Sequence, residues 1–140
     1  MVLGAPADRP AAARIFAGQA VENKVGACSL DESAALVSQA SLVIGVDTGL
    51  THMGWAFSVP VIALFGSTCP YRVVPGREGD ILYAELPCSP CRRRPTCGGT
   101  FDCMSALTPD AVINAAQRYL STESATAPVL ASSETKEEAL

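Results

Sequence analysis

Two short hydrophobic runs in the middle of the chain, residues 42–46 and 61–65, are each followed by a polar turn that contains glycine. Both runs are rich in aliphatic and β-branched residues and show no polar alternation. Such runs are typical of parallel strands covered on both faces. A third short strand is predicted at residues 81–83. Because helical segments alternate with these strands, the pattern predicts an α/β fold in which helices flank a parallel sheet.

The segments before the first run carry weaker signals. Residues 1–3 resemble the end of a strand, and residues 25–28 form a weak strand candidate. The alanine-rich stretch 10–19 favours a helix with Ile15 and Phe16 facing inward. The first part of the chain is therefore expected to supply one helix and short strands.

Two other helices have recognisable starts. Ser29 and Glu32 have the spacing of a capping box, in which each side chain accepts a hydrogen bond from the other residue's backbone N–H. The helix should extend to about residue 40 and place three residues on one face: Leu30, Ala34 and Val37. Thr108 and Pro109 suit the N-cap and first position of a helix that ends near residue 120. Four residues of that last helix are expected to be buried: Val112, Ile113, Ala116 and Leu120.

Composition sets the class of protein. A chain of 140 residues, 49% of them hydrophobic, is long enough for one domain with a real core. The net charge of −4 argues against a nucleic-acid-binding protein, which is normally basic. No segment reaches the roughly 18 consecutive apolar residues of a membrane span, and the first residues do not resemble a secretory signal. We expect a cytoplasmic protein folded over residues 1–120, with a disordered tail at 121–140.

Polar residues follow both predicted strands, at the edge where open α/β sheets bind ligands. Asp47, Thr48 and Gly49 come after the first strand and precede a helix expected at residues 51–57. Thr48 and the backbone N–H groups of Gly49 and Leu50 can bind a diphosphate, since a helix start attracts anions. Turn residues after the second strand would lie beside them: Gly66, Ser67 and Thr68. The alternative is that Asp47 merely caps the helix.

Asp47 and His52 are the two ionisable residues of this stretch. A carboxylate repels phosphate, so Asp47 is expected to orient the loop or to accept hydrogen bonds from substrate hydroxyls. His52, the only histidine, can face the same side as Thr48 and donate to a phosphate oxygen or hold the loop. A histidine with a purely structural partner at a helix start explains it equally well. A catalytic dyad is disfavoured, because no cysteine or serine nucleophile is paired with it.

A cysteine-rich loop at residues 88–103 has no hydrophobic periodicity. Its four thiols, Cys88, Cys91, Cys97 and Cys103, suggest a structural zinc site, because a cytoplasmic chain does not normally keep disulfides. Their spacing lacks the second C-x-x-C of a zinc ribbon, so reduced thiols or oxidisable pairs are the alternative. The arginine run at 92–94 can meet an anionic acceptor or simply be solvated.

Two motifs resemble a known family. Residues 46–53 fit the pattern D-[ST]-G-x-x-H, and residues 60–70 fit P-x-x-A-L-F-G-x-T-x-P. Both resemble the signature of glycosyltransferase family 9, the ADP-heptose:lipopolysaccharide heptosyltransferases. The cysteine segment and the following Leu107-Thr108-Pro109-Asp110 also resemble the C-terminal part of that family. The likeness covers roughly residues 2–120.

This resemblance implies a GT-B enzyme made of two Rossmann-like domains. The chain resembles only the C-terminal, nucleotide-sugar-binding half, and that half is expected to lack its first strand. The family pattern places four residues at the diphosphate and sugar of ADP-heptose, with Ser67 and Thr68 nearby: Asp47, Thr48, Gly49 and His52. With Leu50, whose backbone N–H lies at the helix start, these are the predicted substrate-binding residues.

The resemblance also implies the chemistry. Transfer would be inverting and require no metal cofactor, and the acceptor would be the lipopolysaccharide core at the cytoplasmic face of the inner membrane. The general base would come from an N-terminal domain outside this chain, so the chain alone is expected to be inactive. The alternative is a non-catalytic nucleotide-binding or interaction module with a metal site at the cysteines.

Overall fold

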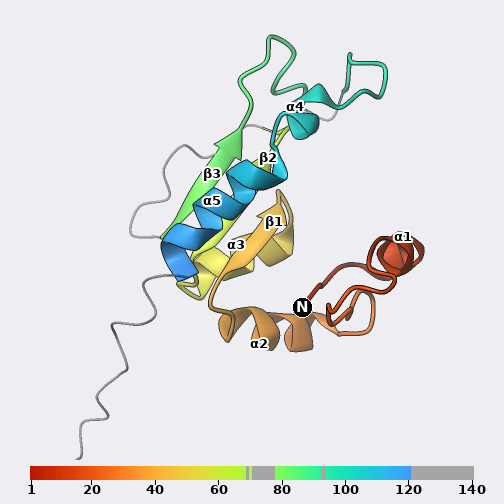
Figure 1. The fold of residues 1–140 in the computed structure, drawn as a ribbon, viewed down its shortest axis with the longest axis vertical. Helices are drawn as coiled ribbons and strands as arrows, with labels where there is room; N and C mark the ends of the chain where they lie inside the picture. The colour runs from red at the N-terminus through yellow and green to blue at the C-terminus, as the bar shows by residue number, and fades with distance from the viewer. Residues whose placement is uncertain (69, 71–77, 93, 121–140) are drawn as a thin grey trace, which may run out of the picture.

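A parallel sheet of three strands lies at the centre of the computed structural model, which describes residues 1–68, 70, 78–92 and 94–120. The strands are β1 (Val43–Val46), β2 (Val61–Phe65) and β3 (Gly79–Tyr83), in that order across the sheet (Figure 1). This confirms the predicted α/β class. Three sequence interpretations lie outside the described residues: those on Cys69, on Arg93 and on the tail 121–140.

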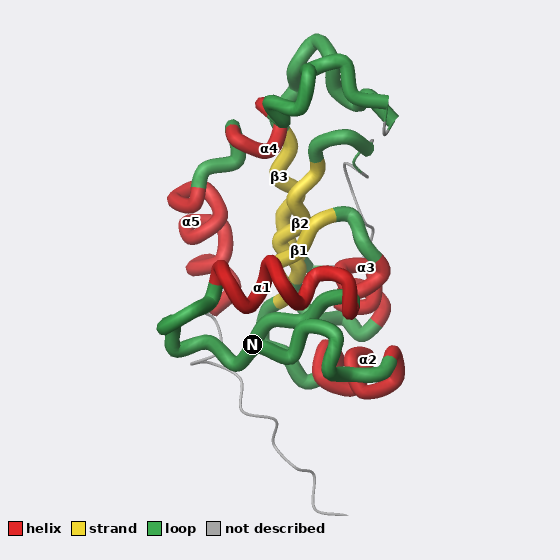
Figure 2. The backbone as a smooth tube through the Cα atoms, turned by 90° about the vertical axis from the view of Figure 1, so that its right-hand side faces the viewer, coloured by secondary structure: helices red, strands yellow, loops and turns green. Residues whose placement is uncertain are grey.

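Helices cover the two faces of this sheet. Figure 2 shows the strands edge-on, with α3 (Gly49–Ala56) on one side and α5 (Pro109–Leu120) on the other. A cluster of buried hydrophobic residues lies between α3 and the sheet: Trp55, Val61, Ala63 and Phe65. Gly54 permits this close approach, because a Cβ there would lie 2.7 Å from Val61 Cγ2. The sheet therefore packs as a layer between helices, which is the arrangement expected of an α/β domain.

Burial differs sharply between the two strands that were expected to be covered on both faces. The prediction is right for β2, where Val61, Ile62 and Ala63 are completely buried. It is wrong for β1, where Ile44 is 50% and Val46 45% exposed. The strand β1 is at the edge of the sheet, and its alternate residues point to opposite faces. The α3 helix covers only one face of β1, so Ile44 and Val46 reach the surface.

The first part of the chain contains less strand than expected. Val2 forms a single isolated parallel bridge with Asn23, so residues 1–3 are not a regular strand. Residues 25–28 form a turn, in which Gly26 has a positive φ of 66°. A short 3-10 helix, η1 (Pro6–Asp8), precedes α1 (Arg9–Ile15).

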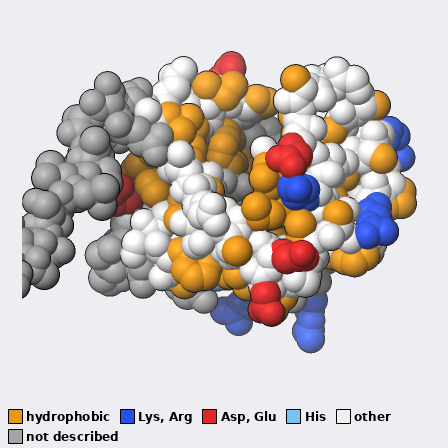
Figure 3. All heavy atoms as spheres, turned by 90° about the horizontal axis from the view of Figure 1, so that it is seen from below, with side chains coloured by type: hydrophobic (Ala, Val, Ile, Leu, Met, Phe, Trp, Pro, Cys, Tyr) orange, Lys and Arg blue, Asp and Glu red, His pale blue; other side chains and the backbone are white. Residues whose placement is uncertain are grey.

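The helix α1 is shorter than the predicted range 10–19, and its orientation differs from the expectation. Ile15 is 63% exposed and Phe16 is half-buried, whereas Ala12 is the buried residue. Because a short helix offers only one or two positions to its neighbours, the small Ala12 occupies the contact and Ile15 points outward. Figure 3, a view from below, shows hydrophobic side chains reaching the surface between charged ones.

The capping box of α2 (Leu30–Ser38) is confirmed. Ser29 Oγ accepts the Glu32 N–H at 3.2 Å, and the Glu32 carboxylate accepts the Ser29 N–H at 2.7 Å. Hydrogen bonding by Ser29, through its backbone N–H first and its side chain second, lowers the pKa of Glu32. Val37 is buried as predicted, but Leu30 at the start of the helix is 68% exposed. The first helical residue projects beyond the contact with α3, so its side chain is not covered.

The start of α5 is also confirmed, since Thr108 Oγ1 accepts the Ala111 N–H at 3.3 Å. Its buried face is different from the predicted one. Ala116 is buried as predicted, and Ala115, which was not predicted, is buried beside it. Ile113 and Leu120, which were expected to be buried, are exposed. The small side chains of Ala115 and Ala116 let α5 lie close to β2 and β3. The larger side chains of the helix then lie on its exposed sides. Among the described residues, no helix has the length and apolar character needed to cross a bilayer.

Candidate functional site

The turn between β1 and α3 presents backbone donors at a helix start. Thr48 is the N-cap residue, in extended conformation, and its side chain makes no capping hydrogen bond. The first intrahelical bond runs from the His52 N–H to the Thr48 carbonyl at 3.2 Å. The N–H groups of Gly49 and Leu50 precede that bond and so have no partner within the helix. A Cβ added at Gly49 would meet nothing within 4 Å, so the side-chain side of this first helical residue is open.

The same turn is held in shape from inside by Thr51, which the sequence interpretation did not single out. Thr51 is 1% exposed and its Oγ1 donates to the Val46 carbonyl at 2.6 Å. The Thr48 N–H donates to the same carbonyl at 2.7 Å. Gly45 makes room for this arrangement, because a Cβ there would lie 2.3 Å from Thr51 Oγ1. In the sequence, this contact could be inferred only from the hydroxyl of Thr51 and the glycine at position 45, and neither residue is unusual in such a segment.

Asp47 and His52 form a pair at the mouth of this turn. His52 Nε2 lies 3.0 Å from Asp47 Oδ1, and both side chains are partly exposed. The His52 and Trp55 rings also meet in a T-shaped arrangement, with ring centroids 5.4 Å apart. Thr48, rather than Asp47, occupies the N-cap position, so Asp47 is not the capping residue by position. The Asp47 carboxylate contacts the imidazole of His52.

The turn after β2 lies at the same edge of the sheet. The parallel register that pairs Val46 with Leu64 brings the ends of β1 and β2 together. Ser67 and Thr68 are half-buried there. Ser89 Oγ donates to the Gly66 carbonyl at 2.6 Å, and the Arg92 N–H donates to the Ser67 carbonyl at 2.7 Å. The cysteine-rich loop therefore fastens the second turn, a connection that sequence spacing did not reveal.

The four cysteines of that loop line one cavity of about 240 Å³, together with Gly66 and Ser67. They are free thiols: Cys88, Cys91, Cys97 and Cys103. In the part of the chain that the structure describes, no three His, Cys, Asp or Glu side chains are grouped closely enough to hold a metal ion. The arrangement therefore does not fit a tetrathiolate zinc site, which needs its four sulfurs about 2.3 Å from one ion.

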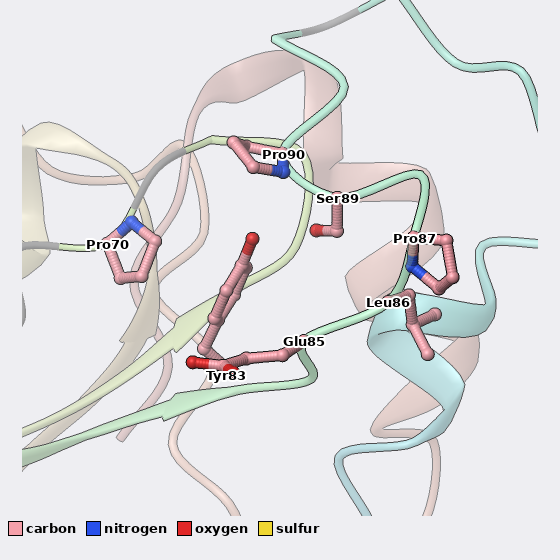
Figure 4. A pocket seen from close by; sticks show the side chains of 7 residues that line it. All are labelled: Pro70, Tyr83, Glu85, Leu86, Pro87, Ser89 and Pro90. Carbon is pink, nitrogen blue, oxygen red and sulfur yellow. The ribbon is translucent and has the colours of Figure 1, made fainter.

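A second cavity, of about 440 Å³, opens at the end of β3 (Figure 4). Figure 4 shows the Tyr83 ring standing between Pro70 and Ser89, with Glu85 beside its base. Seven residues line it: Pro70, Tyr83, Glu85, Leu86, Pro87, Ser89 and Pro90. The sequence interpretation missed this cavity, because only folding brings Pro70 to the end of β3.

Residues 1–100 match the model of glycosyltransferase family 9 (heptosyltransferase). The chain belongs to glycosyltransferase family 9. The resemblance carried by the two motifs is thus confirmed, and the match includes the turns after β1 and β2 as well as the first part of the cysteine-rich loop.

Curated relatives of this family 9 chain carry a more specific name. It is 36% identical over 95 residues to lipopolysaccharide heptosyltransferase 1 of Pseudomonas aeruginosa, a match that covers 67% of the chain and 26% of the relative. It is 37% identical over 67 residues to lipopolysaccharide heptosyltransferase 1 of Salmonella typhimurium, covering 48% of the chain and 21% of the relative. The chain thus spans about a quarter of the length of the curated relatives it matches.

A solved structure has the same fold. The crystal structure of the glycosyl transferase family 9 protein from Veillonella parvula superposes with a TM-score of 0.66 at 22% identity. The match covers 84% of this chain and 35% of that one. At this identity the similarity concerns the fold alone.

Proposed function

We propose that this family 9 chain binds ADP-heptose, the donor of a heptosyl transfer to the inner core of lipopolysaccharide. Membership of the heptosyltransferase family supports a glycosyltransferase function. The observation that carries the donor site is the open start of α3, where the backbone N–H groups of Gly49 and Leu50 stand beside the Asp47–His52 pair. Backbone donors and the positive end of a helix dipole together suit a diphosphate.

The parts of this site have different tasks in the proposal. The hydroxyl of Thr48, which makes no capping bond, donates to a phosphate oxygen together with the two backbone N–H groups. The carboxylate of Asp47 would repel the diphosphate, so it holds His52 and accepts hydrogen bonds from sugar hydroxyls. Ser67 and Thr68, at the same edge of the sheet, add hydroxyl donors from the second turn.

His52 connects these tasks. In the hydrogen bond to Asp47, Nε2 of His52 is the donor. The other ring nitrogen, Nδ1, is then an acceptor if the ring is neutral and a second donor if the ring is protonated. The protonated ring therefore bridges the carboxylate and a phosphate oxygen, which offsets the repulsion between these two anionic groups. The neutral ring, held by Asp47, can only accept a hydrogen bond at Nδ1 and so does not bind a phosphate oxygen there.

The remaining machinery lies outside this chain in our proposal. Residues 1–120 are part of the C-terminal, nucleotide-sugar-binding half of a GT-B enzyme, without its first strand. Transfer is inverting and independent of metal: a general base from the other domain deprotonates the acceptor hydroxyl as it attacks the anomeric carbon. The complete enzyme works in the cytoplasm, against the inner face of the inner membrane where its lipid-linked acceptor lies.

Binding of the donor can be followed on a single residue. Because His52 is the only histidine, its ring protons give one resolved set of NMR signals. Titration with ADP-heptose should shift these signals in a saturable way, while UDP-glucose should not. Asp47→Ala and Thr48→Ala should each weaken binding by roughly tenfold or more, the cost of about one charge-assisted hydrogen bond.

Asp31→Ala is the matched control, because it removes an exposed carboxylate from α2, away from the turn. It should leave the affinity unchanged. Equal binding by the wild type, Asp47→Ala and Thr48→Ala would overturn the donor site. Heptose transfer assayed with the 140-residue chain alone should give no turnover; robust turnover would refute only the proposal that the base lies elsewhere.

A further inference from the structure

We propose that the cysteine cavity is a peroxide-reactive modification site, in which Cys97 is oxidised first and then forms a disulfide with Cys88, Cys91 or Cys103. The proposal goes beyond donor binding and needs no nucleotide. It rests on two features of the described residues: the shared cavity and the backbone donors around Cys97.

The cavity brings together thiols that the chain separates. All four cysteines line the same space of about 240 Å³, and none is paired in a disulfide. Two of them also contact the turn after β2. Cys91 Sγ lies 4.0 Å from the Ser67 carbonyl oxygen, and a Cβ at Gly66 would lie 3.0 Å from Cys103 Sγ. The cavity wall therefore includes thiols from both ends of the loop.

Cys97 differs from the other thiols in its backbone environment. Backbone N–H donors, from Phe101 first and then from Gly99, lower the pKa of the Cys97 thiol. The Thr100 hydroxyl donates to the Cys97 carbonyl at 3.0 Å and closes the turn. Gly98, Gly99 and Phe101 all have positive φ values of 61°, 92° and 50°. The loop is thus shaped to hold a thiolate at Cys97.

The surroundings add little charge of their own. Asp102 is the charged residue among the lining residues that the structure describes. A carboxylate would oppose a thiolate, yet the pKa of Cys97 is still lowered, because the backbone donors outweigh the other contributions. Reactivity toward peroxide follows thiolate character and access, and Cys97 is half-buried at the cavity wall.

The reaction balances with hydrogen peroxide as the oxidant. The Cys97 thiolate attacks one peroxide oxygen, so an S–O bond forms, the O–O bond breaks and the departing hydroxide takes a proton to become water. A second thiol of the cavity then attacks the sulfenic sulfur as it gives up its proton. The S–S bond forms, the S–O bond breaks and a second water leaves. Two thiols lose two electrons, and peroxide gains them.

The test uses the reduced 140-residue chain and peptide mapping by mass spectrometry. With limiting iodoacetamide at neutral pH, Cys97 should be alkylated several-fold faster than Cys28, a half-buried cysteine outside the cavity. The preference should vanish in concentrated urea, because it depends on the folded loop. Limiting peroxide should produce an intrachain disulfide between Cys97 and another cavity cysteine, with a mass loss of about 2 Da.

Cys97→Ser should abolish that disulfide, and Cys28→Ser is the matched control that should retain it. Circular dichroism checks that both variants fold. If Cys97→Ser does not fold, the labelling rates of the wild-type cysteines test the proposal instead. Three outcomes would overturn the proposal: equal labelling of Cys97 and Cys28, a preference that persists in urea, or a bridge that leaves Cys97 out. None of these measurements involves a nucleotide, so their failure is distinct from failure of the donor site.

Discussion

Adding one methyl group at Gly45 should disturb the scaffold of the candidate site. A Cβ at this position would lie 2.3 Å from Thr51 Oγ1, far inside van der Waals contact. Thr51 is 1% exposed and cannot swing into solvent without unpacking. To make room it must give up its 2.6 Å hydrogen bond to the Val46 carbonyl, which shapes the turn between β1 and α3.

The expected cost follows from three contributions. Overpacking of a buried site costs about 1–3 kcal/mol, and loss of the hydrogen bond costs about 1 kcal/mol. Replacing glycine by alanine returns about 0.4–1 kcal/mol, because the unfolded chain has less freedom. We therefore expect Gly45→Ala to lower the free energy of unfolding by about 2 kcal/mol. Urea unfolding can be followed by the fluorescence of Trp55, the only tryptophan, which is buried against β2.

A second background isolates the cause. Thr51→Ala removes the Oγ1 atom with which the added methyl group clashes. The Cβ of residue 51 would lie 3.5 Å from the Cβ added at residue 45, which is an ordinary van der Waals contact. Gly45→Ala should then cost at least about 1 kcal/mol less than in the wild type. The matched control is Gly49→Ala, whose Cβ meets nothing within 4 Å and should change stability by less than about 0.5 kcal/mol. Equal costs of Gly45→Ala in both backgrounds would refute the steric reasoning.

Two other predictions concern stability. Phe65→Ala should lower the free energy of unfolding by about 3–5 kcal/mol, because this 1% exposed ring fills the space between α3 and the sheet; a loss below about 1 kcal/mol in urea unfolding would contradict that packing. The pKa of Glu32 is lowered in the folded chain from 4.5, so its carboxylate stabilises the fold above pH 4.5 and the contribution is lost as the pH falls through the lower folded pKa. The difference in stability between the wild type and Glu32→Gln can be measured by thermal unfolding from pH 7 to pH 3. This difference should shrink on acidification. A difference that grows would show that the Glu32 carboxylate does not stabilise the fold.

Local features were predictable from the sequence because the interacting groups are close along the chain. The Ser29–Glu32 box and the Thr108 cap each join residues three positions apart, so no distant partner is needed. The apolar runs of β1 and β2 were likewise recognisable, as were the polar turns that follow them. The family signature lies in these same turns, and so the candidate donor residues could be named before the fold was known.

Tertiary structure decided which faces are covered and which loops meet. Whether Ile44 is buried depends on a helix packing across β1, and the sequence around Ile44 carries no record of that. The pairing of Asp47 with His52 depends on how sharply the chain turns into α3. The cysteine cavity depends on Ser89 and Arg92 reaching back to the turn after β2. Hydrophobic runs and caps are short-range and local, whereas coverage and loop contacts are set by segments far apart in sequence, so only the packed chain determines them.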